Sequence, residues 1–191
     1  MTCDVKAELH QKLLVGRANV LANLDDLGEY DLRRPLTPTG TNLLGLVKHL
    51  AGLEYGYLGA CVGRPPAEKL SWVEDNSIGE GADMWATPDE TSAYLIGLYQ
   101  RAAAHADTTI DALHLDSPAE VPWWSDKDTT LGVLLIRMVA ETAQHAGHAD
   151  VVRELIDGRA GNTEDILGSD PAFWHQFTGR IRDAAEVFNP N

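Results

Sequence analysis

The sequence predicts an all-α protein: a four-helix bundle with long crossover loops and a short additional C-terminal helix. Apolar residues recur at helical spacing over four long stretches, Pro and Gly separate these stretches, and no segment carries a convincing strand pattern. The chain has 191 residues, which is enough for one domain with a buried core. We expect residues 1–191 to form a single bundle domain, with a C-terminal extension over residues 159–191.

The first helix is expected from about Asp4 to Leu27. Its apolar face is formed by residues at spacings of seven, four and three: Leu13, Val20, Leu24 and Leu27. Residues 33–40 hold two prolines and a glycine, which predict a loop. The second helix is expected to begin near Thr41, a suitable N-cap, and to end before Gly63. A long acidic connection follows over residues 64–85.

The second half of the chain predicts three more helices. Residues 87–90 combine an N-cap threonine, a proline at the first helical position and a capping-box glutamate, so the third helix is expected over 87–113. A loop over 116–130 precedes the fourth helix, expected from Leu131 to Ile156, which Gly158 terminates. Asp170 and Pro171 mark the start of a fifth, shorter helix.

The composition excludes several classes of function. The formal net charge is -14, with 29 acidic and 15 basic residues, and such a surface repels nucleic acid and anionic membranes. No apolar run approaches the ~20 residues that span a bilayer, and the N-terminus lacks the pattern of a signal peptide. The two cysteines, Cys3 and Cys61, cannot form a disulfide framework. We therefore expect a cytoplasmic protein.

Three polar residues of the fourth helix carry the strongest chemical signal. At ~100° per residue, Glu141, His145 and His148 point in one direction. The apolar residues in the same sector are Leu134, Met138, Val152, Leu155 and Ile156. A carboxylate and two imidazoles on a core-facing stripe need a partner, and a divalent metal ion satisfies them together. Two alternatives remain: an ion pair of Glu141 with Arg137, four residues earlier, or a hydrogen-bonded core histidine.

A metal in a bundle core needs a ligand from a second helix, and His49 is the best candidate. It lies at the edge of an apolar face, beside Leu46 and Leu53. Taken alone, His49 also fits a histidine at the boundary of the core. The four remaining histidines are expected to be solvated: His10, His105, His114 and His175.

The segments 43–54 (LLGLVKHLAGLE) and 141–158 (ETAQHAGHADVVRELIDG) resemble the second and fourth helices of the DinB/YfiT-like superfamily. The resemblance implies a four-helix bundle with a buried divalent metal held by three ligands. The usual pattern has a His-x-x-x-His pair on the fourth helix, but Glu141 stands at the first position here. The branch similar to mycothiol-dependent maleylpyruvate isomerase has such a glutamate. The carried-over ligands are therefore His49, Glu141 and His145, with His148 as an alternative third ligand or an outer partner.

The resemblance implies an enzyme that uses one divalent metal, Zn, Ni or Fe, to activate a low-molecular-weight thiol such as mycothiol for S-transfer or isomerisation of an electrophilic substrate. His148 is the predicted catalytic residue, either orienting a ligand or moving a proton. Trp72, Trp123 and Trp124 are candidates for the pocket wall or for loop anchors. Two alternatives are a non-catalytic metal- or ligand-binding bundle and a metal-free bundle that acts as a homodimer.

Overall fold

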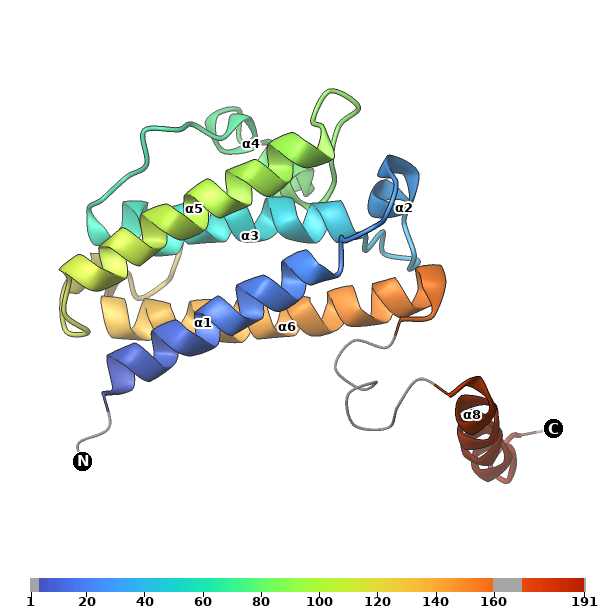
Figure 1. Cartoon of the computed structure of the whole chain (residues 1–191). Coiled ribbons are helices and arrows are strands. Elements are labelled where there is room, and N and C mark those ends of the chain that lie inside the picture. Colours follow the sequence, from blue (N-terminus) through green and yellow to red (C-terminus); the bar gives the residue numbers. More distant parts are fainter. Residues whose placement is uncertain (1–3, 160–169, 191) are drawn as a thin grey trace.

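The computed structural model describes residues 4–159 and 170–190, and its four long helices pack as a bundle (Figure 1). These helices are α1 (Val5–Ala22), α3 (Leu43–Tyr57), α5 (Ser92–Ala112) and α6 (Leu131–Asp157). In Figure 1, α1 and α6 run from left to right, whereas α3 and α5 run from right to left. Because α3 and α5 are parallel, the chain between them must return along the bundle. The predicted all-α bundle with a long crossover is therefore confirmed.

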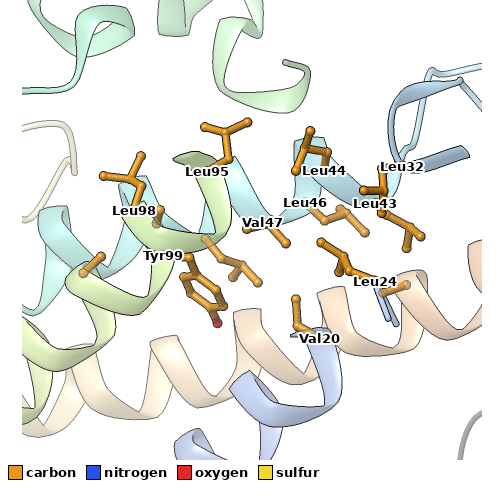
Figure 2. Packing of buried hydrophobic residues seen from close by; sticks show 14 of the residues in the cluster. Val20, Leu24, Leu32, Leu43, Leu44, Leu46, Val47, Leu95, Leu98 and Tyr99 are labelled. Atoms are coloured by element: carbon orange, nitrogen blue, oxygen red, sulfur yellow. The ribbon is translucent and has the colours of Figure 1, made fainter. Parts of the chain in front are cut away.

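The main hydrophobic core joins α1, α3, α5 and α6 (Figure 2). Val20 of α1 faces the side on which Leu46 and Val47 of α3 and Tyr99 of α5 lie, and all four are at most 1% exposed. A second cluster fills the other end of the bundle with side chains such as Leu13, Tyr57, Ile110, Leu131 and Leu134. Each such burial stabilises the fold by roughly 1.5–3 kcal/mol, so packing rather than helix propensity holds the bundle.

An ionic cross-link runs through the interior between these clusters. The Arg17 guanidinium on α1 donates to both carboxylate oxygens of Glu54 on α3, at 2.7 and 2.8 Å. It also donates to Asp107 on α5 at 2.6 Å. Glu54 is fully buried, and removing its partner would leave an uncompensated charge in the core. The three helices are thereby fixed in register at this level.

The ends of α1 and α6 meet at one end of the bundle. The first helix ends at Ala22, five residues before the expected Leu27, because Arg153 of α6 binds the carbonyls of Asn23 and Asp25 at 2.9 and 2.7 Å. These bonds satisfy acceptors that the end of a helix leaves unpaired. The end of α6 is as predicted, with Gly158 in the left-handed conformation at φ 79°.

Two predicted N-caps are wrong, by one and by four residues. The N-cap of α3 is Asn42 and not Thr41, since the Asn42 side chain accepts from the Gly45 N–H at 2.7 Å. The N-cap of α5 is Thr91, whose hydroxyl accepts from the Tyr94 N–H. The capping-box bond expected at 87–90 does form, at 2.8 Å, but it closes a turn before the helix.

The connections contain short elements that the sequence analysis missed. They are α2 (Glu29–Arg33), η1 (Ala60–Val62), α4 (Ser71–Glu74), η2 (Ser77–Glu80) and η3 (Ala82–Met84). The loop before α6 forms an antiparallel pair, β1 (Pro118–Glu120) with β2 (Asp128–Thr130), which corrects the expectation of no strand. The segment containing η3 packs directly on α3, and this contact positions the site described below.

The C-terminal helix α8 (Pro171–Glu186) begins where predicted, with Asp170 as its N-cap. It has no buried residue and lies beside the bundle rather than within it (Figure 1). Cys3 and part of the expected extension over 159–191 lie outside the described residues. Within the described ranges, no helix combines the length and apolar character needed to cross a bilayer.

The contact between Gly45 and Met84 leads to a stability prediction. A Cβ atom on Gly45 would lie 1.9 Å from the carbonyl oxygen of Met84, so Gly45→Ala must displace the η3 segment. We expect it to lower the free energy of unfolding by about 1–3 kcal/mol in urea denaturation.

Gly147→Ala serves as the matched control, because a Cβ on this α6 glycine meets nothing within 4 Å. It should raise the free energy of unfolding by about 0.5–1 kcal/mol through helix propensity. Equal effects of the two substitutions would contradict the close approach of η3 to α3.

Candidate metal centre

Side chains from α3 and α6 converge on one point in the bundle. His49, Glu141 and His145 each offer a ligand atom, and these atoms all lie within 4.8 Å of one another. The His49 and His145 rings stand edge to face, with centroids 5.0 Å apart. His145 Nε2 lies 3.7 Å from a Glu141 oxygen, beyond hydrogen-bond length. The structure therefore brings together the three residues that were predicted as ligands, close to one another but without a short bond between them.

The chemistry of this donor set fits a divalent metal ion. Burial, together with the neighbouring His49 and His148 rings, lowers the pKa of His145 to about 4 against the opposing effect of Glu141. His145 is therefore a neutral imidazole at neutral pH, with a lone pair available for coordination. Two imidazoles and one carboxylate are a common donor set for Zn, Ni or Fe(II), and three protein donors leave coordination positions open.

Asp83 lies in the connection between α3 and α5, the crossover segment (residues 58–91), and it binds the ring of His49. Its Oδ2 atom lies 2.6 Å from His49 Nδ1, and both side chains are largely buried. Burial acts to raise the pKa of Asp83, but the hydrogen bond and charge of His49 outweigh it and hold that pKa below its usual value. With Nδ1 engaged, Nε2 is the His49 nitrogen left for a metal. This carboxylate–histidine arrangement is typical of histidines that bind metals.

Arg137 and His148 stand beside the other two predicted ligands. Arg137 Nη2 lies 3.1 Å from one carboxylate oxygen of Glu141, so the ion pair considered as an alternative forms. The second oxygen of Glu141 remains directed at His145. His148 Nδ1 lies 3.4 Å from His145 Nδ1. If His145 donates through Nδ1, the lone pair on its Nε2 faces Glu141. Each of the three predicted ligands thus has its own outer partner.

The position of His148 differs from the one expected. Helical spacing placed it on the core-facing stripe, but the residue is exposed, as is Leu155 at 57%. The reason is that α6 contacts α1 and α3 on one side only, so residues at the edge of its stripe face solvent. Among the described residues, the group that could hold a metal contains Glu141 and not His148.

A cavity of about 460 Å³ adjoins His49 and Asp83. Trp72 and Trp123 line the cavity, which is one of the two roles expected for them, whereas Trp124 packs against Tyr57. Trp72 is also a core residue, at 2% exposed. Cys61 is buried as expected, and burial raises the pKa of its thiol to about 11, so it is a poor nucleophile at neutral pH.

Two histidines expected to be solvated have protein partners instead. His10 Nε2 pairs with Asp107 at 2.9 Å, and His105 Nε2 lies 2.7 Å from the carbonyl oxygen of Arg64. His114 and His175 are exposed as expected. The functional residue that sequence reasoning missed is Asp83, which lies 34 positions after His49 in a segment without helical periodicity. No spacing rule links the two residues.

Comparison with known proteins places this geometry in context. Residues 8–158 match the family model described as mycothiol-S-transferase. The crystal structure of a conserved protein from Enterococcus faecalis is similar, with a TM-score of 0.63 and 15% identity over 82% of this chain and 99% of that chain. At that identity the likeness shows the fold alone. No curated protein matches the chain.

The burial of His145 predicts a specific pH dependence in the metal-free protein. Its ring protons should titrate with a midpoint near pH 4 in NMR spectra, against 6.5 for a free histidine. Because the unfolded state binds this proton first, the stability should fall as the pH drops from about 6.5 to about 4.

His145→Gln should remove this fall in stability between pH 6.5 and pH 4, which amounts to at most about 3 kcal/mol in the free energy of unfolding. A midpoint near 6.5 in the wild-type protein would show that the ring is not buried as described.

The bond from Asp83 to His49 predicts a loss of metal affinity in Asp83→Asn. Removing the carboxylate should weaken metal binding by about 10–100-fold in competition with a chelating dye. Asp75→Asn is the control, since Asp75 lies in the same connection and is exposed. Equal metal affinities for the two variants would mean that Asp83 does not support a ligand.

Proposed function

The chain belongs to the mycothiol-S-transferase family, a DinB/YfiT-like family, and on that premise we propose that it is a metal-dependent S-transferase or isomerase for a low-molecular-weight thiol of the mycothiol type. The observation that carries the proposal is the convergence of His49, Glu141 and His145 beside an apolar cavity. A divalent metal held by these three residues would bind the thiol sulfur as thiolate and supply a nucleophile at neutral pH.

The residues around the ligands have distinct parts in the proposed reaction. Asp83 fixes the tautomer of His49, so that Nε2 faces the metal position. Arg137 holds one Glu141 oxygen and thereby turns the other towards His145. His148 orients His145 through the contact between their Nδ1 atoms, and when this contact opens, the exposed His148 accepts the proton that leaves the thiol at its freed Nδ1 and passes it to solvent.

The protein offers no competing nucleophile at this site. Cys61, the free cysteine among the described residues, has a raised thiol pKa and does not line the cavity. The nucleophile must therefore come from a second molecule, which agrees with a family that acts on thiols. Three donors rather than four also favour a reactive metal over a structural one, since structural sites are closed by protein ligands.

Metal content tests the first half of the proposal. Untagged wild-type protein should contain close to one equivalent of Zn, Ni or Fe by elemental mass spectrometry. His49→Ala, Glu141→Gln and His145→Ala should each lose it. His114→Ala is the control, because this histidine is exposed and outside the site. A wild-type protein that takes up none of these metals, even after reloading, would exclude a metalloenzyme.

S-conjugation of mycothiol, followed by mass spectrometry over a panel of electrophiles, tests the second half. Loss of the metal ligands should lower kcat/KM by at least about 100-fold, since the activated thiol is lost. His148→Ala should retain metal but lower kcat by about 100-fold. Bound metal with no conjugation of any electrophile would support the non-catalytic binding bundle instead.

A further inference from the structure

We propose that the cavity beside His49 is the subsite for the electrophilic co-substrate, and that it takes a neutral, flat aromatic molecule. The inference rests on the proposed function and names the second substrate. The cavity, of about 460 Å³, is large enough for one or two fused rings. It lies between one face of α3 and the crossover segment, and it reaches His49 and Asp83 at its polar end. An occupant there would lie next to the candidate metal centre.

The floor and walls of the cavity form a slot. Gly52 and Gly56, one helical turn apart on α3, leave the backbone bare along the floor. A Cβ at Gly52 would lie 3.5 Å from Trp72 Nε1, and one at Gly56 would lie 3.9 Å from the Trp123 ring. The indole rings of Trp72 and Trp123 therefore lie next to the positions that Cβ atoms on Gly52 and Gly56 would occupy. A slot with an aromatic wall favours a planar ring through stacking and dispersion.

The charges in the lining of the cavity favour a neutral occupant over an anionic one. The lining contains no lysine or arginine, and its ionisable groups are His49, the Asp83 carboxylate and the Tyr57 phenol. The net charge of the chain is -14. Away from the His49 end, where the candidate metal centre lies, a carboxylate or phosphate in this slot would face no lysine or arginine of the lining, at a high desolvation cost.

The sparse polar lining also argues against the thiol carrier as occupant. Mycothiol carries its cysteine on polyhydroxylated rings, and each buried hydroxyl would need a hydrogen-bond partner. Beyond His49, Asp83 and Asn76, the remaining walls are mainly apolar, with Leu53, Val73 and Ile78 among them. We therefore place the polyhydroxylated part of the thiol on the open side near the exposed His148 and only the electrophile in the slot.

An unpaired donor inside the wall supports an occupant with an acceptor atom. The Trp72 indole N–H is buried and has no hydrogen-bond partner among the described residues. It lies beside Gly52, at the floor of the slot. A small adjustment of the ring would let it donate to a nitro or carbonyl oxygen, which removes the cost of an unsatisfied buried donor. Such groups are also those that make an aromatic ring electrophilic.

For an aryl halide the group transfer balances without another reactant. The thiolate sulfur forms a bond to the ring carbon that carries the halogen, the carbon–halogen bond breaks, and halide leaves with the electron pair. The thiol proton goes to His148 and then to water. No oxidant or reductant is required.

The first experiment measures binding without turnover. 1,3-Dinitrobenzene is flat and neutral and has no leaving group, and it is titrated into metal-loaded, full-length protein by calorimetry. Gly56→Leu fills the slot and should weaken binding at least 10-fold. Trp123→Ala removes a wall and should weaken it as well; its side chain is 61% exposed, so this variant should fold even if Gly56→Leu does not. Ala104→Leu, at an exposed position of α5, is the control and should bind as the wild type does. Absence of binding to the wild type would overturn the inference.

The second experiment separates the two substrates. With mycothiol and 1-chloro-2,4-dinitrobenzene, Gly56→Leu should raise KM for the aryl halide about 10-fold and leave KM for mycothiol unchanged. A raised KM for mycothiol alone would show that the slot holds the thiol carrier, and the inference would be wrong. Dinitrobenzene binding that responds to the variants, without S-conjugation of any electrophile, would support the aromatic subsite and contradict the proposed function.

Discussion

An ionisable side chain in the interior of this bundle needs a charged or hydrogen-bonding partner. This requirement determines how the buried polar groups are placed. Arg17, Glu54 and Asp107 satisfy it with bonds of 2.6–2.8 Å that tie α1, α3 and α5 together. His145 and Glu141 form no such bond with each other, because their closest atoms are 3.7 Å apart, although Arg137 pairs with the other Glu141 oxygen at 3.1 Å. A helix bundle that pairs its other buried charges tightly, but leaves an imidazole and a carboxylate apart and facing each other, has the arrangement that a bound cation would complete.

The crossover between α3 and α5 contributes as much to the site as the helices do. It supplies Asp83 to His49, and it supplies Trp72 and Val73 to the cavity. This segment packs closely on α3 only because residue 45 is a glycine, since a Cβ atom at Gly45 would clash with the Met84 carbonyl. Gly45 lies one helical turn before His49, so the same stretch of helix presents the ligand and receives the segment that orients it. This long connection therefore contributes side chains to the site and does not merely join two helices.

The sequence was most informative where periodicity and local chemistry act alone. The presence of α1, α3 and α6, the end of α6 at Gly158, and the convergence of His49 with Glu141 and His145 all follow from helical spacing and from the resemblance. The far ends of two helices do not, since α1 ends at Ala22 rather than Leu27 and α3 ends at Tyr57 rather than just before Gly63. The sequence was less informative where distant segments compete for the same atoms. Thr91 rather than Thr87 is the N-cap of α5, and Glu90 stays in the turn before the helix, where its carboxylate accepts from the buried Lys48 at 2.8 Å as well as from the Thr87 N–H.

Asp83 and the hairpin of β1 and β2 were missed for a related reason. Their positions depend on tertiary contacts and not on any repeat in the chain. His148 was placed on the core face because spacing gives the direction of a side chain but not the extent of the neighbouring helices that would cover it. The centre of a buried stripe is therefore predictable from spacing, and its edges are not.

The length of α6 has a consequence for what can be joined to this protein. Glu141 lies 16 residues before Asp157, the last residue of α6, which at 1.5 Å per residue is about 24 Å along the axis. The chain leaves the bundle at that far end, and the family match also stops there, at residue 158. The appended α8 segment is thus physically remote from the chemistry. A reporter or an immobilising surface attached beyond α6 would leave the approach of small molecules to His49 unobstructed.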